Sequence, residues 1–155
     1  MTGTPEGLTL RRAVEADQVL IRQMVIKEAG LDPTSLDWSH FVIAELAGEV
    51  VGLGQIRPYR GCPELGSIYT RPQFEGRGIG GAVIGRLIED WRLPGPIYLE
   101  CQSHNATYYQ RFGFREIPWY KAPMPLKLKS GMGAFLGRIF GFRISAMILE
   151  RKVPS

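Results

Sequence analysis

The sequence predicts a single α/β (or α+β) domain, in which helices pack on a mixed β-sheet. The prediction rests on chain length, on composition, and on short apolar runs that alternate with helix-like stretches. The chain has 155 residues, the size of one ordinary domain, so we expect one domain over residues 1–155. Hydrophobic residues make up 45% and charged residues 22% of the chain, which is typical of a globular protein and argues against a disordered one.

Short apolar runs bounded by turn residues predict strands, and apolar residues at helical spacing predict helices. The predicted strands cover residues 8–12, 40–46, 49–57, 65–70, 97–101, 114–119 and 144–149. The predicted helices cover 16–29, 79–91, about 105–112, and a weaker, glycine-interrupted stripe from Met132 to Phe140. Ala47-Gly48 joins the second and third strands into a hairpin. This order, mixed in its connections, indicates a sheet covered by helices.

The charge of the chain is unevenly distributed. Eight Lys and Arg against two acids give residues 115–155 a net charge of +6, whereas eleven against thirteen give the first 114 residues −2. A basic C-terminal quarter can attract an anionic partner, although solvated helix and strand faces are the commoner explanation. The segment lacks the aromatic and basic motifs of the usual RNA-binding modules, so we expect no nucleic-acid partner.

Cysteine content and hydropathy bear on metal binding, cellular location and membrane association. Cys62 and Cys101 are too few for a disulfide framework, and with two histidines they form no recognisable zinc site. We therefore expect no metal and a reducing, cytoplasmic location. No apolar run approaches the roughly 18 residues of a membrane span, so we expect no membrane partner.

The most informative stretch is a glycine-rich turn between the strand at 65–70 and the helix at 79–91. It contains Gly76, Gly78, Gly80 and Gly81. Glycines let a ligand approach the backbone closely, and the first N–H groups of a helix have no partner within the helix. Together with the helix dipole they form an anion site, which suits a phosphate or pyrophosphate. Arg77 and Arg71 can add positive charge there. A plain glycine-rich connection is the weaker explanation.

A dinucleotide-binding fingerprint is one alternative for this turn. Gly76-x-Gly78-x-x-Gly81 matches it literally, and Glu100 follows about 20 residues later. The fingerprint expects its first glycine directly at the strand end, however, and residues 71–75 intervene here. It also usually opens a doubly wound sheet, for which the 74 residues after Gly81 leave little room.

A second alternative extends over far more of the chain. PQFEGRGIGGAVIGRLI resembles the acyl-CoA-binding motif of the GNAT superfamily of N-acyltransferases, Arg/Gln-x-x-Gly-x-Gly/Ala, with Gly78 and Gly80 at its glycine positions. Glu75 stands where the family usually has Arg or Gln. Residues 10–17 resemble the family's opening strand and helix start, and residues 41–57 its hairpin. Asn105, Tyr109 and Gly113-Phe114 resemble its late Asn…Tyr-x-x-x-Gly-Phe signature, with about three residues fewer between Asn and Tyr.

The resemblance covers roughly residues 8–120 and implies a fold. It implies a mostly antiparallel mixed sheet of about six to seven strands, with helices on both faces and a V-shaped splay between the strands that flank the glycine-turn helix. It also implies acetyl-CoA as cosubstrate. The groups implied to bind it are the backbone of Ile68, Tyr69 and Thr70, the turn from Arg77 through Gly78, Ile79 and Gly80 to Gly81, and Asn105.

The resemblance also implies catalytic roles. Tyr109 occupies the position of the tyrosine that protonates the departing thiolate, whereas Tyr108 suits the core or a substrate wall. Glu100 and Glu64 match two positions used for the general base, and a base without a dedicated side chain stays a third alternative. His104 more often serves as a cap or surface residue than as a base.

The function implied is transfer of an acetyl group from acetyl-CoA to a primary amine, by direct attack in a ternary complex. The acceptor is a small molecule or a protein or peptide amine, and the basic C-terminal quarter favours an acidic or neutral one. A non-catalytic acyl-CoA sensor on the same fold is the alternative. We expect a monomer or a homodimer.

Overall fold

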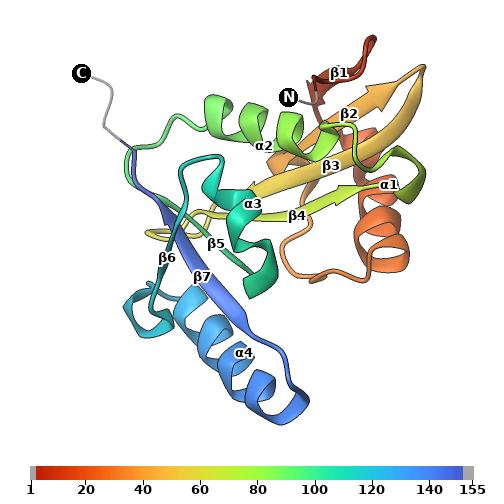
Figure 1. The fold of residues 1–155 in the computed structure, drawn as a ribbon. Coiled ribbons are helices and arrows are strands. Elements are labelled where there is room, and N and C mark those ends of the chain that lie inside the picture. Colours follow the sequence, from red (N-terminus) through yellow and green to blue (C-terminus); the bar gives the residue numbers. More distant parts are fainter. Residues whose placement is uncertain (1–2, 152–155) are drawn as a thin grey trace. The chain divides into compact units, whose positions relative to one another are not determined.

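A computed structural model describes residues 3–151. The strands are β1 (Thr9–Arg12), β2 (Phe41–Leu46), β3 (Glu49–Arg57), β4 (Glu64–Thr70), β5 (Ile97–Gln102), β6 (Arg115–Ile117) and β7 (Ile144–Leu149). The α-helices are α1 (Gln18–Arg22), α2 (Ile79–Asp90), α3 (Ala106–Gln110) and α4 (Leu126–Phe140). The seven strands follow one another in the sheet in the order β1-β2-β3-β4-β5-β7-β6. This mixed sheet with helices confirms the predicted fold class (Figure 1).

Contacts divide the chain into two compact units. The first is the chain up to Arg57 with Leu65–Arg92, and the second is Pro58–Glu64 with the chain from Leu93 onward. Strands β1, β2 and β3 pair antiparallel in the first unit, as β5, β7 and β6 do in the second. Within the second unit, β4 pairs parallel with β5 at Glu64↔Tyr98. The single domain over 1–155 and the V-shaped splay stay predictions, because both concern how the units are placed together.

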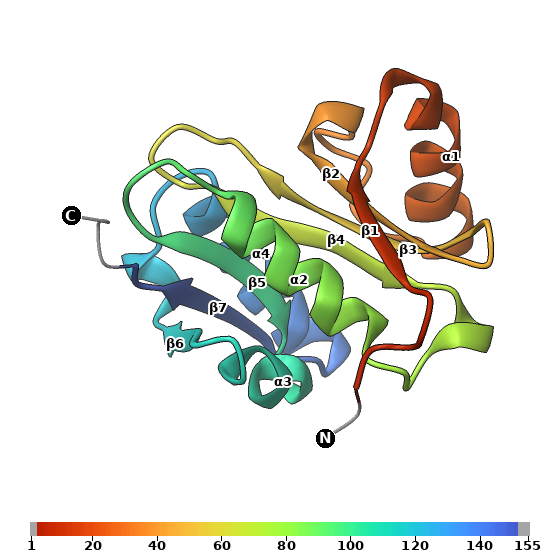
Figure 2. The ribbon, with the colours of Figure 1, turned by 90° about the horizontal axis from the view of Figure 1, so that it is seen from above.

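The first unit is a strand layer with a helix on each face (Figure 2). Side chains alternate along a strand, and Phe41, Ile43 and Leu53 pack with the α1 segment in one buried core. Gly52 and Gly54 face the opposite side, where added Cβ atoms would lie 3.1 Å from Ile79 and 3.0 Å from Val83 of α2. Two glycines on β3 therefore allow α2 to approach the sheet closely.

The second unit also has helices on both faces of its strands. Ser130 on α4 donates a hydrogen bond to Glu100 of β5. Cys101, the next residue, points to the other face, where its thiol helps to raise the pKa of Tyr109 on α3. A small core of Cys62, Ala122 and Leu126 holds the start of α4 in place. Glu100 therefore lies on the face of β5 that α4 covers, and Tyr109 lies on the face that α3 covers.

Three predicted elements differ from the structure. The helix at 16–29 is present but continues from α1 into a π-helical segment, Gln23–Glu28. The strand predicted at 114–119 is only Arg115–Ile117, because Pro118 ends it and Trp119–Lys121 form a 3₁₀ turn. Helix α4 begins at Leu126, six residues before the predicted stripe, directly after Pro125. Within residues 3–151, no helix is long and apolar enough to cross a membrane.

Asp17 ties the start of the first helix to β1. Its carboxylate accepts hydrogen bonds from Arg11 at 2.7 and 3.0 Å and from the backbone N–H of Val14 at 2.8 Å. The Arg11 hydrogen bond holds the pKa of the Asp17 carboxyl below its ordinary value. A lowered carboxyl pKa stabilises the fold above the unfolded pKa, near 3.9, and this stability is lost as the pH falls.

We expect Asp17→Asn to lower the free energy of unfolding by about 1–2 kcal/mol at pH 7, because Arg11 and the Val14 N–H lose a charged acceptor. Below pH 4 the difference from the unaltered protein should shrink. Urea denaturation at both pH values measures this, with the exposed neighbour Glu15→Gln as control. An equal loss at pH 7 and pH 3 would show that the carboxylate charge is not the cause.

Candidate active site

The glycine turn has the backbone conformation that the sequence predicts for an anion cradle. Gly76 and Gly78 have φ of +77° and +79°, a region that side-chain-bearing residues rarely adopt. Gly78 caps the N-terminus of α2, and its carbonyl accepts the N–H of Ala82 at 3.1 Å. The preceding N–H groups, those of Ile79, Gly80 and Gly81, belong to the first turn of the helix, which has no helical acceptor for them.

The two arginines of this region have different surroundings. Arg77 is exposed in the turn, and its guanidinium lies 5.5 Å from the centre of the Phe74 ring. Arg71 pairs with Glu28 at 3.2 Å and with Glu49 at 3.4 Å. Arg71 therefore ties the end of β4 to neighbouring elements, and Arg77 is the better placed of the two to meet an anion.

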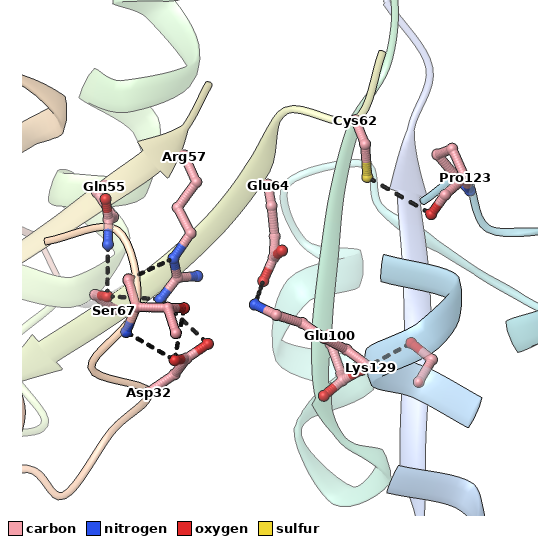
Figure 3. Close-up of polar contacts among 11 residues, drawn as sticks. Asp32, Gln55, Arg57, Cys62, Glu64, Ser67, Glu100, Pro123 and Lys129 are labelled. Atoms are coloured by element: carbon pink, nitrogen blue, oxygen red, sulfur yellow. Dashed lines mark hydrogen bonds and ion pairs between the residues drawn. The ribbon is translucent and has the colours of Figure 1, made fainter. Parts of the chain in front are cut away.

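Strand β4 is bent just before the backbone groups expected to hold the cosubstrate. Ser67 has a φ of +52°, which is strained for a residue with a side chain. Its hydroxyl accepts hydrogen bonds from Gln55 at 2.9 Å and from Arg57 at 3.1 Å (Figure 3). Both donors are buried, and Arg57 also lies 3.9 Å from Asp32. This buried network holds the bend, and the sequence offered no local signal for it.

The bend precedes Ile68, Tyr69 and Thr70. The backbone N–H of Arg71 donates to the Val51 carbonyl of β3 at 2.9 Å. Because backbone groups of successive strand residues point to alternate sides, Tyr69 shares the side of Arg71. Ile68 and Thr70 turn their backbone groups to the side away from β3. The family resemblance implies that all three bind the cosubstrate; Ile68 and Thr70 have the more suitable orientation.

Tyr109 lies on α3 in an aromatic group of the second unit. Its ring makes edge contacts with Tyr108 at 5.2 Å and with Phe114 at 6.3 Å between centroids. Burial, with a smaller effect of Cys101, raises the pKa of the Tyr109 phenol to about 12. The hydroxyl is therefore protonated at neutral pH, as a proton donor must be.

Both predicted base candidates contact the same turn of α4 (Figure 3). Glu64, only 4% exposed, pairs with Lys129 at 3.5 Å between Oε1 and Nζ. Glu100, half-buried on β5, accepts a hydrogen bond from Ser130 at 2.7 Å. Lys129 also lies 5.8 Å from the centre of the Tyr59 ring. Consecutive residues of α4 thus position two carboxylates that are far apart in the sequence.

The predicted residues divide between the two units. Glu64, Glu100 and Tyr109 belong to the second unit, whereas the glycine turn and β4 from Leu65 onward belong to the first. Asn105 and His104 are both exposed in the 3₁₀ turn Ser103–Asn105, just before α3. Lys129 and Ser130 are functional candidates that sequence reasoning missed. Among the described residues, no three His, Cys, Asp or Glu side chains group as a metal site would require.

A family model supplies the decisive comparison. The model described as an acetyltransferase (GNAT) domain matches residues 37–116, which is just over half of the chain. The chain belongs to the GNAT acetyltransferase family. The match includes the hairpin β2–β3, the glycine turn, α2, β5 and α3, so the resemblance found from the motifs is confirmed. No curated protein matches the chain.

Several solved structures share the fold. Rv2747 from Mycobacterium tuberculosis, in complex with CoA and NLQ, is 24% identical, with a TM-score of 0.69 over 93% of this chain and 99% of that one. N-acetylglutamate synthase from Neisseria gonorrhoeae, with coenzyme A and N-acetyl-glutamate, is 18% identical, with a TM-score of 0.70 over 93% of this chain. The match spans only 35% of that synthase. A GNAT acetyltransferase from Bacillus cereus is 14% identical, with a TM-score of 0.65 over 94% and 98% of the two chains.

Proposed function

We propose that this GNAT protein transfers the acetyl group of acetyl-CoA to a primary amine of a small molecule, protein or peptide. The observation that carries the proposal is the turn with left-handed Gly76 and Gly78 that opens α2. Its amides, from Arg77 to Gly81, would bind the pyrophosphate, and the backbone of Ile68 and Thr70 would hold the pantetheine arm. Rv2747 and the synthase, which share the fold, are both complexes with CoA, and this supports CoA as the ligand.

In the proposed reaction the amine attacks acetyl-CoA itself, and no acyl-enzyme intermediate forms. The protonated amine loses one proton to the base and attacks the thioester carbonyl. The C–S bond breaks, and the thiolate takes a proton from Tyr109. The nitrogen loses its second proton as the amide forms, and this proton returns to Tyr109 through water, which leaves the amide and free CoA. Burial raises the pKa of both cysteines, Cys62 and Cys101, to about 11. Neither thiol is poised as a nucleophile, which favours attack by the amine itself over an acyl-cysteine intermediate.

Glu100 is the proposed base, acting through a water molecule. Glu100 is half-buried, so a water molecule can reach its carboxylate, whereas Glu64 is only 4% exposed.

We expect Glu100→Gln to lower kcat/KM by about tenfold, less than a direct base would contribute because water relays the proton, with an unchanged melting temperature. The matched variant Glu64→Gln removes a buried charge pair, so it should lower the melting temperature and leave turnover per folded molecule nearly normal. The measurements are steady-state kinetics and thermal unfolding of both variants. If Glu64→Gln instead lowered kcat/KM and Glu100→Gln lowered the melting temperature, Glu64 would be the base.

A thiol-release screen tests the function as a whole. Acetyl-CoA is offered with small amines, polyamines, amino acids and peptides with free N-termini, and free CoA is followed with a thiol reagent. We expect release that depends on one class of amine and an acetylated product of matching mass. CoA binding without release from any amine would instead indicate an acyl-CoA sensor.

A further inference from the structure

We propose that α4 docks the protein on an anionic membrane surface. In this arrangement its large apolar side chains lie among the lipid headgroups, and its basic side chains contact the phosphates. The inference concerns a face of the second unit that the proposed acetyl transfer does not use.

Beyond Leu126, which lies in the small core with Cys62 and Ala122, helix α4 packs against its own unit with small residues. Ser130 and Gly137 are buried. An added Cβ would lie 3.0 Å from Ile144 at Gly133 and 2.2 Å from the carbonyl oxygen of Phe142 at Gly137. Larger residues at these positions would push the helix away from β7. The glycines that weaken the helical propensity of this segment are therefore required by its packing.

After the buried Leu126, the large apolar side chains of α4 point outward instead. The outer face of α4 consists of Leu128, Met132, Phe135, Leu136, Ile139 and Phe140, with exposed fractions from 39% to 72%. Their spacing of three and four residues places them on one side of the helix, opposite Ser130 and Gly137. A helix on the surface of a globular domain normally turns such a stripe toward the core. A contiguous exposed stripe of this kind marks an interaction surface.

The basic residues on and beside α4 indicate an anionic partner. No acidic residue occurs between Glu116 and Glu150, and the exposed Lys127, Arg138 and Arg143 lie on α4 or just after it. Two copies paired through this face would bring like charges together. An apolar stripe with exposed basic side chains beside it instead matches an anionic lipid surface, to which such helices bind lying in the interface.

Aromatic residues extend the same surface. Trp119 and Tyr120 are 44% and 57% exposed, and a Cβ added at Gly131 of α4 would lie 3.0 Å from the Trp119 ring. Tryptophan and tyrosine rings are favoured at the level of lipid headgroups. The sequence-based expectation of no membrane partner rested on the lack of a spanning segment, which a helix lying on the surface does not need.

The test is flotation of the full chain with vesicles of phosphatidylcholine alone or with about 30% phosphatidylglycerol. We expect binding to the anionic vesicles that is at least about tenfold tighter than to phosphatidylcholine and that weakens with added salt. Phe135→Gln with Ile139→Gln should weaken it at least about tenfold, and so should Lys127→Glu with Arg138→Glu. Val19→Gln, which alters a 77% exposed apolar residue on α1, should not.

Melting temperature and CoA binding are measured on every variant, and both should be unchanged because these side chains are exposed. The proposal would be overturned if the protein bound neither kind of vesicle. It would also be overturned if both double variants bound anionic vesicles as tightly as the unaltered protein. Sedimentation over a concentration series adds a third decisive outcome. A dimer that Phe135→Gln with Ile139→Gln dissociates, without vesicle binding, would assign the outer face of α4 to a second copy instead.

Discussion

Replacing Gly80 by valine is expected to lower the affinity for CoA by at least about 100-fold, while the protein stays folded. Gly80 is the second residue of α2, in the turn that would face the pyrophosphate. A valine side chain there would keep the phosphates away from the N–H groups of the first turn. Losing two hydrogen bonds to a charged acceptor, each worth about 1.5–3 kcal/mol, corresponds to a 100-fold loss or more.

Gly85→Val supplies the matched control on the same helix. Gly85 is exposed, and nothing lies within 4 Å of an added Cβ there, so the same substitution should leave CoA affinity unchanged. Calorimetric titration with CoA and thermal unfolding are compared for the two variants. Unchanged affinity in a folded Gly80→Val protein would remove the pyrophosphate from this turn, and with it the proposed mode of cosubstrate binding.

The parts of the fold that sequence reasoning predicted are those with local signals. Gly76 and Gly78 mark a turn that needs left-handed backbone, and Ile79, Val83, Ile84 and Leu87 recur at helical spacing and are all buried in α2. The hairpin of β2 and β3 is similarly encoded by two apolar runs with Ala47-Gly48 between them. In each case the residues that form the element also specify it.

The parts that were missed depend on contacts between distant residues. The Lys129–Glu64 pair joins residues 65 positions apart, and the Ser130–Glu100 bond joins residues 30 apart. The start of α4 was missed because Leu126 is buried against Cys62 and Ala122, which lie outside the helix. Likewise, the left-handed Ser67 depends on Gln55 and Arg57 of another strand. Spacing along the chain carries no sign of such contacts.

Tyr109 occupies the position where the largest effect on turnover is expected. Its hydroxyl is buried enough to raise the phenol pKa to about 12. A raised pKa means that the folded protein holds this proton more tightly, so the donor is present at any pH well below 12. Turnover of the unaltered protein should therefore show no basic decline from Tyr109 up to pH 10. A decline near pH 9 that Tyr109→Phe removes would contradict this.

Tyr109→Phe removes one hydroxyl and little volume, so the ring contacts with Tyr108 and Phe114 should persist. If the hydroxyl protonates the departing thiolate, kcat should fall by roughly 100-fold with a nearly constant affinity for acetyl-CoA. Tyr108→Phe is the control, because Tyr108 is the half-buried neighbour on the same helix, and it should keep near-normal kcat. The measurements are kcat, CoA affinity and melting temperature on one preparation of each variant. Near-normal kcat in Tyr109→Phe, with a lowered melting temperature, would make Tyr109 a core residue and leave the thiolate to depart without an acid.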